Sequence, residues 1–228
     1  MTGSEESQVI PVEKLQRANK LNDAFRKGRQ AWEVLEDLQA IKKPILVDFN
    51  NVLANNNMPL IPNPEGKQFL SALRNIGDVI IATTARGWDP VHDFLQNSGM
   101  WSDEIILMVS PNWKFLSNEA YGETKSAKDR LMTAFERNLS NRGIEFDTFY
   151  HRSSPVKKPL SPLFDKPFDI PLIDDSAMAT LKPYPGILGI HVQPFMDDIE
   201  REYMISDSGI PLPKAVEKVQ EHYSPVVI

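Results

Sequence analysis

Acidic side chains directly follow two of the apolar runs in this sequence. Asp48 comes after Ile45–Val47, and Asp174 and Asp175 come after Ile170–Ile173. Short, partly β-branched apolar runs of this kind are typical of strands that are buried on both faces of a parallel sheet. Because ligands of open parallel sheets bind beyond the carboxyl ends of the strands, we expect the three carboxylates to meet at one edge of a sheet.

Hydroxyl and guanidinium groups follow a third apolar run, Val79–Ile81. They belong to Thr83, Thr84 and Arg86. A threonine hydroxyl at the same edge of the sheet can hold phosphoryl oxygens as negative charge redistributes during a reaction. Arg86 fits either a substrate anion or a surface salt bridge.

Three carboxylates brought together repel one another unless a cation neutralises their charge. Mg²⁺ is the expected cation, because it prefers carboxylates, waters and substrate phosphate as ligands. Such an ion offsets the charge between the acids and an anionic substrate, and it orients the substrate. An aspartate can then act as the nucleophile and form a covalent intermediate such as an aspartyl phosphate.

Strand and helix patterns alternate along the chain. Strands are predicted around 45–47 and 79–81 and at 104–109, 168–174 and 186–192, and helices at 64–77, 89–99, 125–143 and 213–223, with a further strand considered at 144–151. This alternation indicates βαβ units. We therefore expect a doubly wound α/β fold with a mostly parallel sheet.

An apolar stripe at helical spacing runs through residues 11–42, which predicts one or two helices with a break at Gly28. Its members are Leu15, Ala18, Leu21, Phe25, Trp32, Leu35 and Leu38. The stripe either packs on the main domain or forms a dimerisation or partner arm. The chain is accordingly divided into an N-terminal tail and helical extension, 1–43, and an α/β domain, 44–228.

The composition excludes several classes of function. The 228 residues contain no cysteine, which excludes disulfides, thiolate metal sites and a cysteine nucleophile. The net charge of −6 argues against general affinity for nucleic acid but allows a phosphorylated small molecule. No apolar run approaches the roughly 20 residues of a membrane span, and the first twenty residues are polar, so we expect a cytoplasmic protein.

The segments that contain Asp48 and Asp174 resemble the first and fourth motifs of the haloacid dehalogenase superfamily of phosphohydrolases. The first motif is a strand followed by Asp-x-Asp-x-(Thr/Val)-(Leu/Val), and this sequence has Asp48-Phe49-Asn50-Asn51-Val52-Leu53 at that place. The fourth motif is a pair of acids after a strand, matched by Asp174-Asp175.

The second and third motifs have more than one candidate each. The second is a strand that ends in threonine or serine, for which Thr84 fits best and Thr83 is the alternative. The third is a lysine that is often followed by proline. Lys158 is the best match, and Lys157 and Lys166 are its rivals. Together the motifs extend over residues 44–192, about two-thirds of the chain.

The resemblance implies a Rossmann-like fold of the haloacid dehalogenase type and a role for each matched residue. Asp48 would be the nucleophile and a metal ligand, and the backbone carbonyl of Asn50 would also bind Mg²⁺. Asp174 and Asp175 would hold the metal directly or through water. The transferred group and the rest of the substrate would be bound by the remaining candidates, which are Thr84 and Lys158 for the former and Thr83, Arg86 and Asn51 for the latter.

Asn50 departs from the family pattern, because phosphatases of this superfamily carry a general acid/base there. An amide cannot fill that role, and general acid/base catalysis contributes typically about 10²–10⁴-fold. The first hypothesis is therefore a Mg²⁺-dependent hydrolase of phosphorylated substrates with weak turnover. The alternative is a degenerate member that binds a phosphorylated ligand or protein partner, and a metal-free dehalogenase is disfavoured by the paired acids.

The segment 110–167 is longer than a simple crossover requires, and it is interpreted as a small lid or as additional sheet and helix. The short stretch after the first motif leaves no room for a large cap. A nearly open site admits larger substrates, including phosphates of proteins or nucleic-acid ends.

Overall fold

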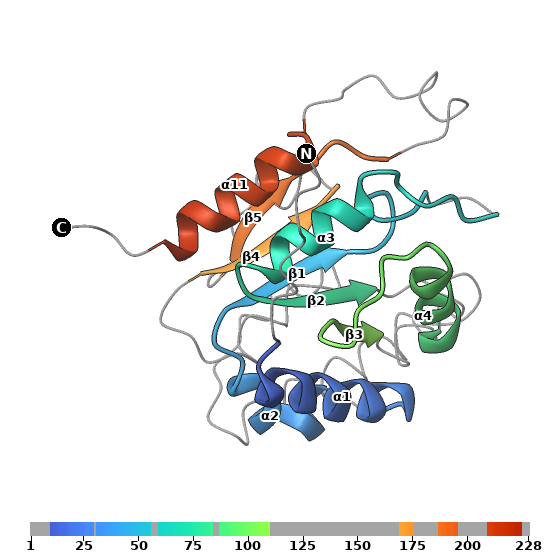
Figure 1. Ribbon diagram of the computed structural model, residues 1–228, viewed down its shortest axis with the longest axis vertical. Coiled ribbons are helices and arrows are strands. Elements are labelled where there is room, and N and C mark those ends of the chain that lie inside the picture. The colour runs from blue at the N-terminus through green and yellow to red at the C-terminus, as the bar shows by residue number, and fades with distance from the viewer. Residues whose placement is uncertain are drawn as a thin grey trace, which may run out of the picture.

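Five parallel strands form a sheet in the part of the chain that the structure describes (Figure 1). The computed structural model describes residues 10–29, 31–55, 59–83, 87–109, 169–175, 187–195 and 209–224. Within them the strands are β1 (Pro44–Asp48), β2 (Asp78–Thr83), β3 (Ile106–Val109), β4 (Ile170–Asp174) and β5 (Ile187–His191). Every neighbouring pair is parallel, in the order β3-β2-β1-β4-β5. The predicted α/β class and parallel sheet are confirmed.

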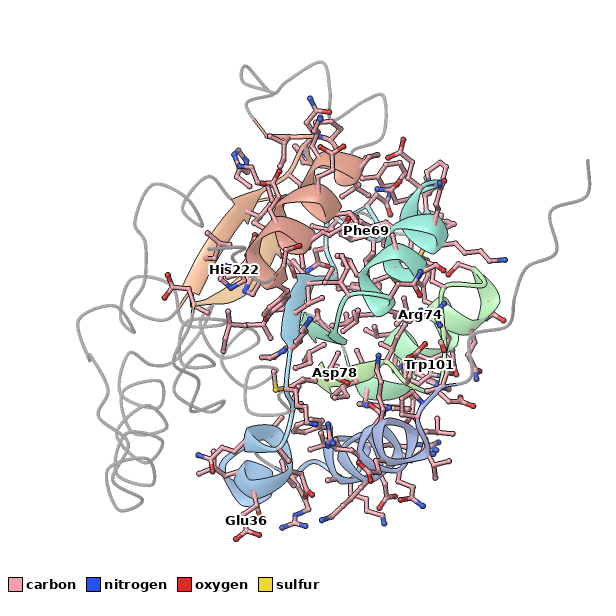
Figure 2. All side chains as sticks on the ribbon, turned by 60° about the vertical axis from the view of Figure 1, so that its left-hand side comes forward. Glu36, Phe69, Arg74, Asp78, Trp101 and His222 are labelled. Atoms are coloured by element: carbon pink, nitrogen blue, oxygen red, sulfur yellow. The ribbon has the colours of Figure 1, made fainter. Side chains whose placement is uncertain are left out.

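Alternate residues of each strand are buried on opposite faces of the sheet, as the pleat requires. One face carries Val47, Ile81 and Ile173, and it packs against helices α3 (Gly66–Arg74), α4 (Trp88–Asn97) and α11 (Leu212–Tyr223). Phe69 of α3, labelled in Figure 2, belongs to this cluster. Because helices also cover the other face, the strands are continuous apolar runs.

The other face is covered by the N-terminal helices α1 (Val12–Arg26) and α2 (Leu35–Gln39), with the short 3₁₀ helix η1 (Ala31–Val34) between them. Figure 1 shows α1 and α2 on the side of the sheet opposite α3 and α11. Leu21 and Phe25 of α1 pack in one cluster with Leu46, Ile80 and Leu172. The apolar side of the N-terminal segment is thus buried on the sheet.

Asn22 joins α1 to the edge of the sheet through two buried hydrogen bonds. Its Nδ2 donates to the carbonyl of Ile105 at 2.7 Å, and its Oδ1 accepts from the backbone N–H of Leu107 at 2.8 Å. A buried side-chain amide that satisfies two backbone groups fixes the position of a helix relative to a strand. The apolar periodicity gave no indication of this contact.

Three predicted helix ends are confirmed, and each is followed by a glycine. Gly28 has a φ of 80° and separates α1 from the segment that follows, and Gly99 has a φ of 69° just beyond α4. Left-handed backbone of this kind is accessible to glycine without steric cost. Gly77, after α3, lies so close to the carbonyl of Lys43 that a Cβ there would collide with it.

Several predictions concern residues outside the described ranges. They are the helix at 125–143, the strand at 144–151 and the lid at 110–167. Among the described residues, no helix has the length and apolar character needed to cross a membrane.

Candidate metal centre

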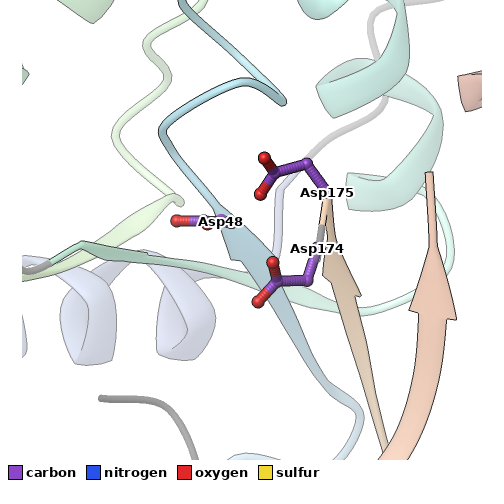
Figure 3. Close-up of side chains that lie close together, drawn as sticks. All are labelled: Asp48, Asp174 and Asp175. Carbon is purple, nitrogen blue, oxygen red and sulfur yellow. The ribbon is translucent and has the colours of Figure 1, made fainter. Parts of the chain in front are cut away.

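Asp48 and Asp174 are the last residues of two neighbouring strands. β1 and β4 pair with Leu46 opposite Leu172 and Val47 opposite Ile173, so both strands end in an aspartate at the same level. Asp175 follows directly. Figure 3 shows the three side chains gathered at the carboxyl ends of these strands. The structure therefore brings together the three acids that the sequence predicts to meet.

The spacing of the three carboxylates suits one cation. Each of Asp48, Asp174 and Asp175 offers a ligand atom, and these atoms all lie within 4.8 Å of one another. Two oxygens on opposite sides of a Mg²⁺ ion are about 4.2 Å apart, given Mg–O distances of 2.0–2.1 Å. Asp48 and Asp174 are each only 7% exposed, and Asp175 is half-buried. This trio of oxygen donors can hold a metal ion, because hard cations prefer such ligands.

The order of the strands places these acids at a particular point of the fold. From β1 the sheet extends through β2 and β3 on one side, and through β4 and β5 on the other. The carboxyl ends of β1 and β4 therefore flank the topological switch point, where ligands of open α/β sheets bind.

A tight turn follows β1 and holds its polar residues near the acids. The N–H of Asn51 donates to the carbonyl of Ala54 at 2.6 Å, and the N–H of Leu53 donates to the carbonyl of Phe49 at 3.0 Å. Within the described part of the chain, the buried Oδ1 atoms of Asn50 and Asn51 have no hydrogen-bond donor. Both amides therefore keep acceptor capacity that no described residue uses.

Asn51 contacts the acids directly. Its Nδ2 donates to Oδ2 of Asp175 at 2.9 Å, a contact that the sequence interpretation, which assigned Asn51 to the substrate, did not foresee. The backbone of the same aspartate is held by His191, whose Nε2 lies 3.0 Å from the Asp175 carbonyl. That nitrogen must carry the proton, because a carbonyl oxygen only accepts.

His191 was given no role from the sequence. It is the last residue of β5, at register with Asp174, and a histidine at the end of a predicted strand was the only signal that could have pointed to it.

Thr83 lies on the opposite face of the sheet from Asp48. Thr83 lies on the same face as Ile81, and its neighbour on β3 is Val109, which packs in the cluster with α3, α4 and α11. Asp48 lies on the other face, the face of Leu46, because successive residues of a strand point to opposite faces. The Thr83 hydroxyl is buried and has no hydrogen-bond partner among the described residues. The other phosphate-binding candidates lie outside the described ranges: Thr84, Arg86, Lys157, Lys158 and Lys166.

Comparison of the chain with protein-family models, with curated proteins and with solved structures finds no match.

Proposed function

We propose that this protein is a Mg²⁺-dependent hydrolase of the haloacid dehalogenase type that acts on a phosphorylated substrate through Asp48. The observation that carries the proposal is the convergence of Asp48, Asp174 and Asp175 within 4.8 Å. Their position at the switch point of a five-stranded parallel sheet supports a Rossmann-like fold of this type.

Asp48, Asp174 and Asp175 would hold the ion together with the backbone carbonyl of Asn50. Bound Mg²⁺ would supply positive charge that offsets repulsion between the acids and the substrate phosphate. The buried position of Asp48 and Asp174 suits this task, because electrostatic interactions are stronger where water is excluded.

In the proposed reaction an oxygen of the Asp48 carboxylate attacks phosphorus. The phosphorus–oxygen bond to the leaving group breaks, and its electron pair remains on the leaving oxygen. Water then attacks the phosphorus of the aspartyl phosphate, and cleavage of the acyl phosphate bond restores the carboxylate and releases inorganic phosphate. Asn50 has no carboxyl proton to give to the leaving oxygen, so substrates whose leaving groups need little protonation are favoured.

The remaining candidates complete the proposed site. Thr84 and Lys158 would bind the transferred phosphoryl group, and Arg86 another part of the anionic substrate. The choice of Thr84 over Thr83 is supported by the placement of Thr83 on the far face of the sheet. A phosphorylated small molecule is the preferred substrate, with protein and nucleic-acid phosphates as alternatives.

Hydrolysis of an aryl phosphate with Mg²⁺ tests the proposal, because a good leaving group bypasses the missing acid. We expect Asp48→Asn to lower the rate at least about 1,000-fold, as removal of a nucleophile does. Asp93→Asn is the matched control, since Asp93 is exposed on α4 and its change leaves the net charge the same as in the test variant. EDTA should abolish the activity, and added Mg²⁺ should restore it.

Equal rates for wild type and Asp48→Asn would refute the role of Asp48 as the nucleophile. Activity that survives EDTA would favour a metal-free dehalogenase-like hydrolase instead.

Asn50 favours a second candidate, a protein that binds a phosphorylated ligand or partner without turnover. The two candidates separate on Asn50→Asp, which restores a carboxyl group at this position. A large gain in turnover from an almost inactive wild type would indicate that the other catalytic residues are in place and that only the general acid/base is missing. Ligand binding with no turnover in either protein would favour the binding role.

A further inference from the structure

Asn51 occupies an unusual backbone conformation directly beside the acids. Its φ of 55° is the only positive value of a non-glycine residue among the described residues. Asparagine tolerates this left-handed region better than most residues do. A residue held in such a conformation is fixed by its surroundings, and such positions cluster at functional sites.

The backbone of Asn51 is tied down on both sides. Its N–H donates to the carbonyl of Ala54 at 2.6 Å, and its own carbonyl accepts from the N–H of Phe195 at 2.6 Å. The first bond closes the turn after β1, and the second joins that turn to the segment after β5. The side chain of Asn51 therefore projects from a fixed point.

That side chain reaches Asp175. The 2.9 Å bond from Nδ2 of Asn51 to Oδ2 of Asp175 spans 124 positions of the chain. A carboxylate has about four lone-pair sites, so one N–H bond leaves sites for a cation while it restricts rotation of the group. Asp175 follows the strand instead of belonging to it, and it is more exposed than Asp48 and Asp174.

We infer that Asn51 is a positioning residue for the metal: its amide holds the Asp175 carboxylate in the orientation that completes the cation site. This inference rests on the proposed function, because it assumes that Asp175 is a ligand. Hydrogen-bond partners of metal ligands typically affect metal affinity by about 10–100-fold when they are removed.

Direct binding of Mg²⁺ and Mn²⁺, measured by calorimetry on the full chain, tests the inference. Asn51→Gly removes the amide, and glycine adopts a φ of 55° without strain. We expect Asn51→Gly to weaken binding of both ions about 10–100-fold.

Asn63→Ala is the matched control. Asn63 supports the same turn through a bond from its Nδ2 to the carbonyl of Val52 at 2.8 Å, but no bond joins it to the three acids among those of the described residues. It should leave metal affinity within about threefold of wild type if removal of a ligand's own partner is what weakens binding.

The outcomes separate the inference from the proposal beneath it. If wild type binds the ions and Asn51→Gly binds them equally well, or no worse than Asn63→Ala, Asn51 has no positioning role. If wild type binds neither ion, or if Asp175→Asn leaves binding unchanged, the assignment of Asp175 as a ligand fails first.

Discussion

The two ends of the sheet both bury acidic side chains, and their surroundings differ. At the carboxyl ends of β1 and β4, Asp48, Asp174 and Asp175 lie within 4.8 Å of one another. At the amino ends of β2 and β3, Asp78 and Glu104 lie among basic side chains instead. The same residue type therefore serves two different arrangements in one sheet.

The acids of the amino end take part in a network with Lys14 of α1 and Arg74 of α3. Nζ of Lys14 lies 3.0 Å from Oε2 of Glu104 and 3.9 Å from Oδ1 of Asp78, and Nη1 of Arg74 lies 3.2 Å from Oε1 of Glu104. Figure 2 labels Arg74 and Asp78. Lys14 also donates to the carbonyl of Gly77 at 3.0 Å, beside the start of β2.

A structural acid and a candidate metal ligand thus differ in their neighbours. The amino-end acids alternate with cations of the same chain, and the network joins α1 and α3 to the sheet. The carboxyl-end acids lie close to one another at the switch point, where the trio can hold a cation. We therefore expect the amino end to govern folding stability and the carboxyl end to govern metal binding.

Removal of Glu104 should have the largest effect on stability. Glu104→Ala leaves Arg74 and Lys14 partly buried without their nearest carboxylate, and loss of one partner of a buried pair costs several kcal/mol. We expect the free energy of unfolding, measured by urea denaturation, to fall by about 3 kcal/mol. Asp23→Ala is the control, because the Asp23–Lys27 pair is exposed and should contribute about 0.5 kcal/mol or less. Similar losses in the two variants would contradict the structural role of the amino end.

Metal binding should stabilise the protein only through the three acids at the carboxyl ends of β1 and β4. At a Mg²⁺ concentration about a hundred times the Kd, an ion that binds only the folded state raises the free energy of unfolding by about 2.7 kcal/mol. We expect this gain, measured against EDTA, in wild type and in Glu104→Ala, and its loss in Asp174→Asn. An undiminished gain in Asp174→Asn would place the ion elsewhere.

Asp78 offers a smaller, pH-dependent effect. Burial raises the pKa of Asp78 above its ordinary value of 3.8, and Lys14 and Arg17 only partly oppose that shift. The folded state thus binds this proton more tightly than the unfolded state, so the contribution of Asp78 to stability falls as the pH rises from 3.8 through the raised pKa.

Asp78→Asn removes this loss, because the amide does not titrate. The stability of Asp78→Asn relative to wild type should therefore increase with pH across that window and level off above it. Denaturation of both proteins between pH 3.5 and pH 7 measures the difference, from which the titrations that they share cancel. A difference that is constant with pH would contradict the raised pKa.

Much of the fold could be predicted from local pattern. The apolar runs that predict β1, β2 and β4 are confirmed as strands, because a strand with both faces covered must be apolar throughout. The convergence of Asp48, Asp174 and Asp175 was also predicted, since parallel strands share one carboxyl edge. The helix stops at Gly28, Gly77 and Gly99 were also predicted from local sequence. Glycine suits these positions because the backbone has a positive φ at Gly28 and Gly99 and a Cβ would collide with Lys43 at Gly77.

Contacts between distant segments could not be predicted in the same way. Three hydrogen bonds join segments that lie far apart in the sequence. The bond from Asn51 to Asp175 spans 124 positions, the bond from Lys14 to Gly77 spans 63, and the bond from Asn22 to Ile105 spans 83. Apolar periodicity carries no information about which polar side chains will face each other. The register also decided the face on which Thr83 lies, which the sequence left open against Thr84.

By itself the sequence determined that two strands, β1 and β4, end in acids, because burial on two faces leaves an apolar run and a polar residue marks where the run stops. Only the tertiary structure decided that β1 and β4 are neighbours, and so that Asp48 and Asp174 stand side by side. Strand order is set by how helices pack on both faces of the whole sheet, and that packing is a property of the assembled chain.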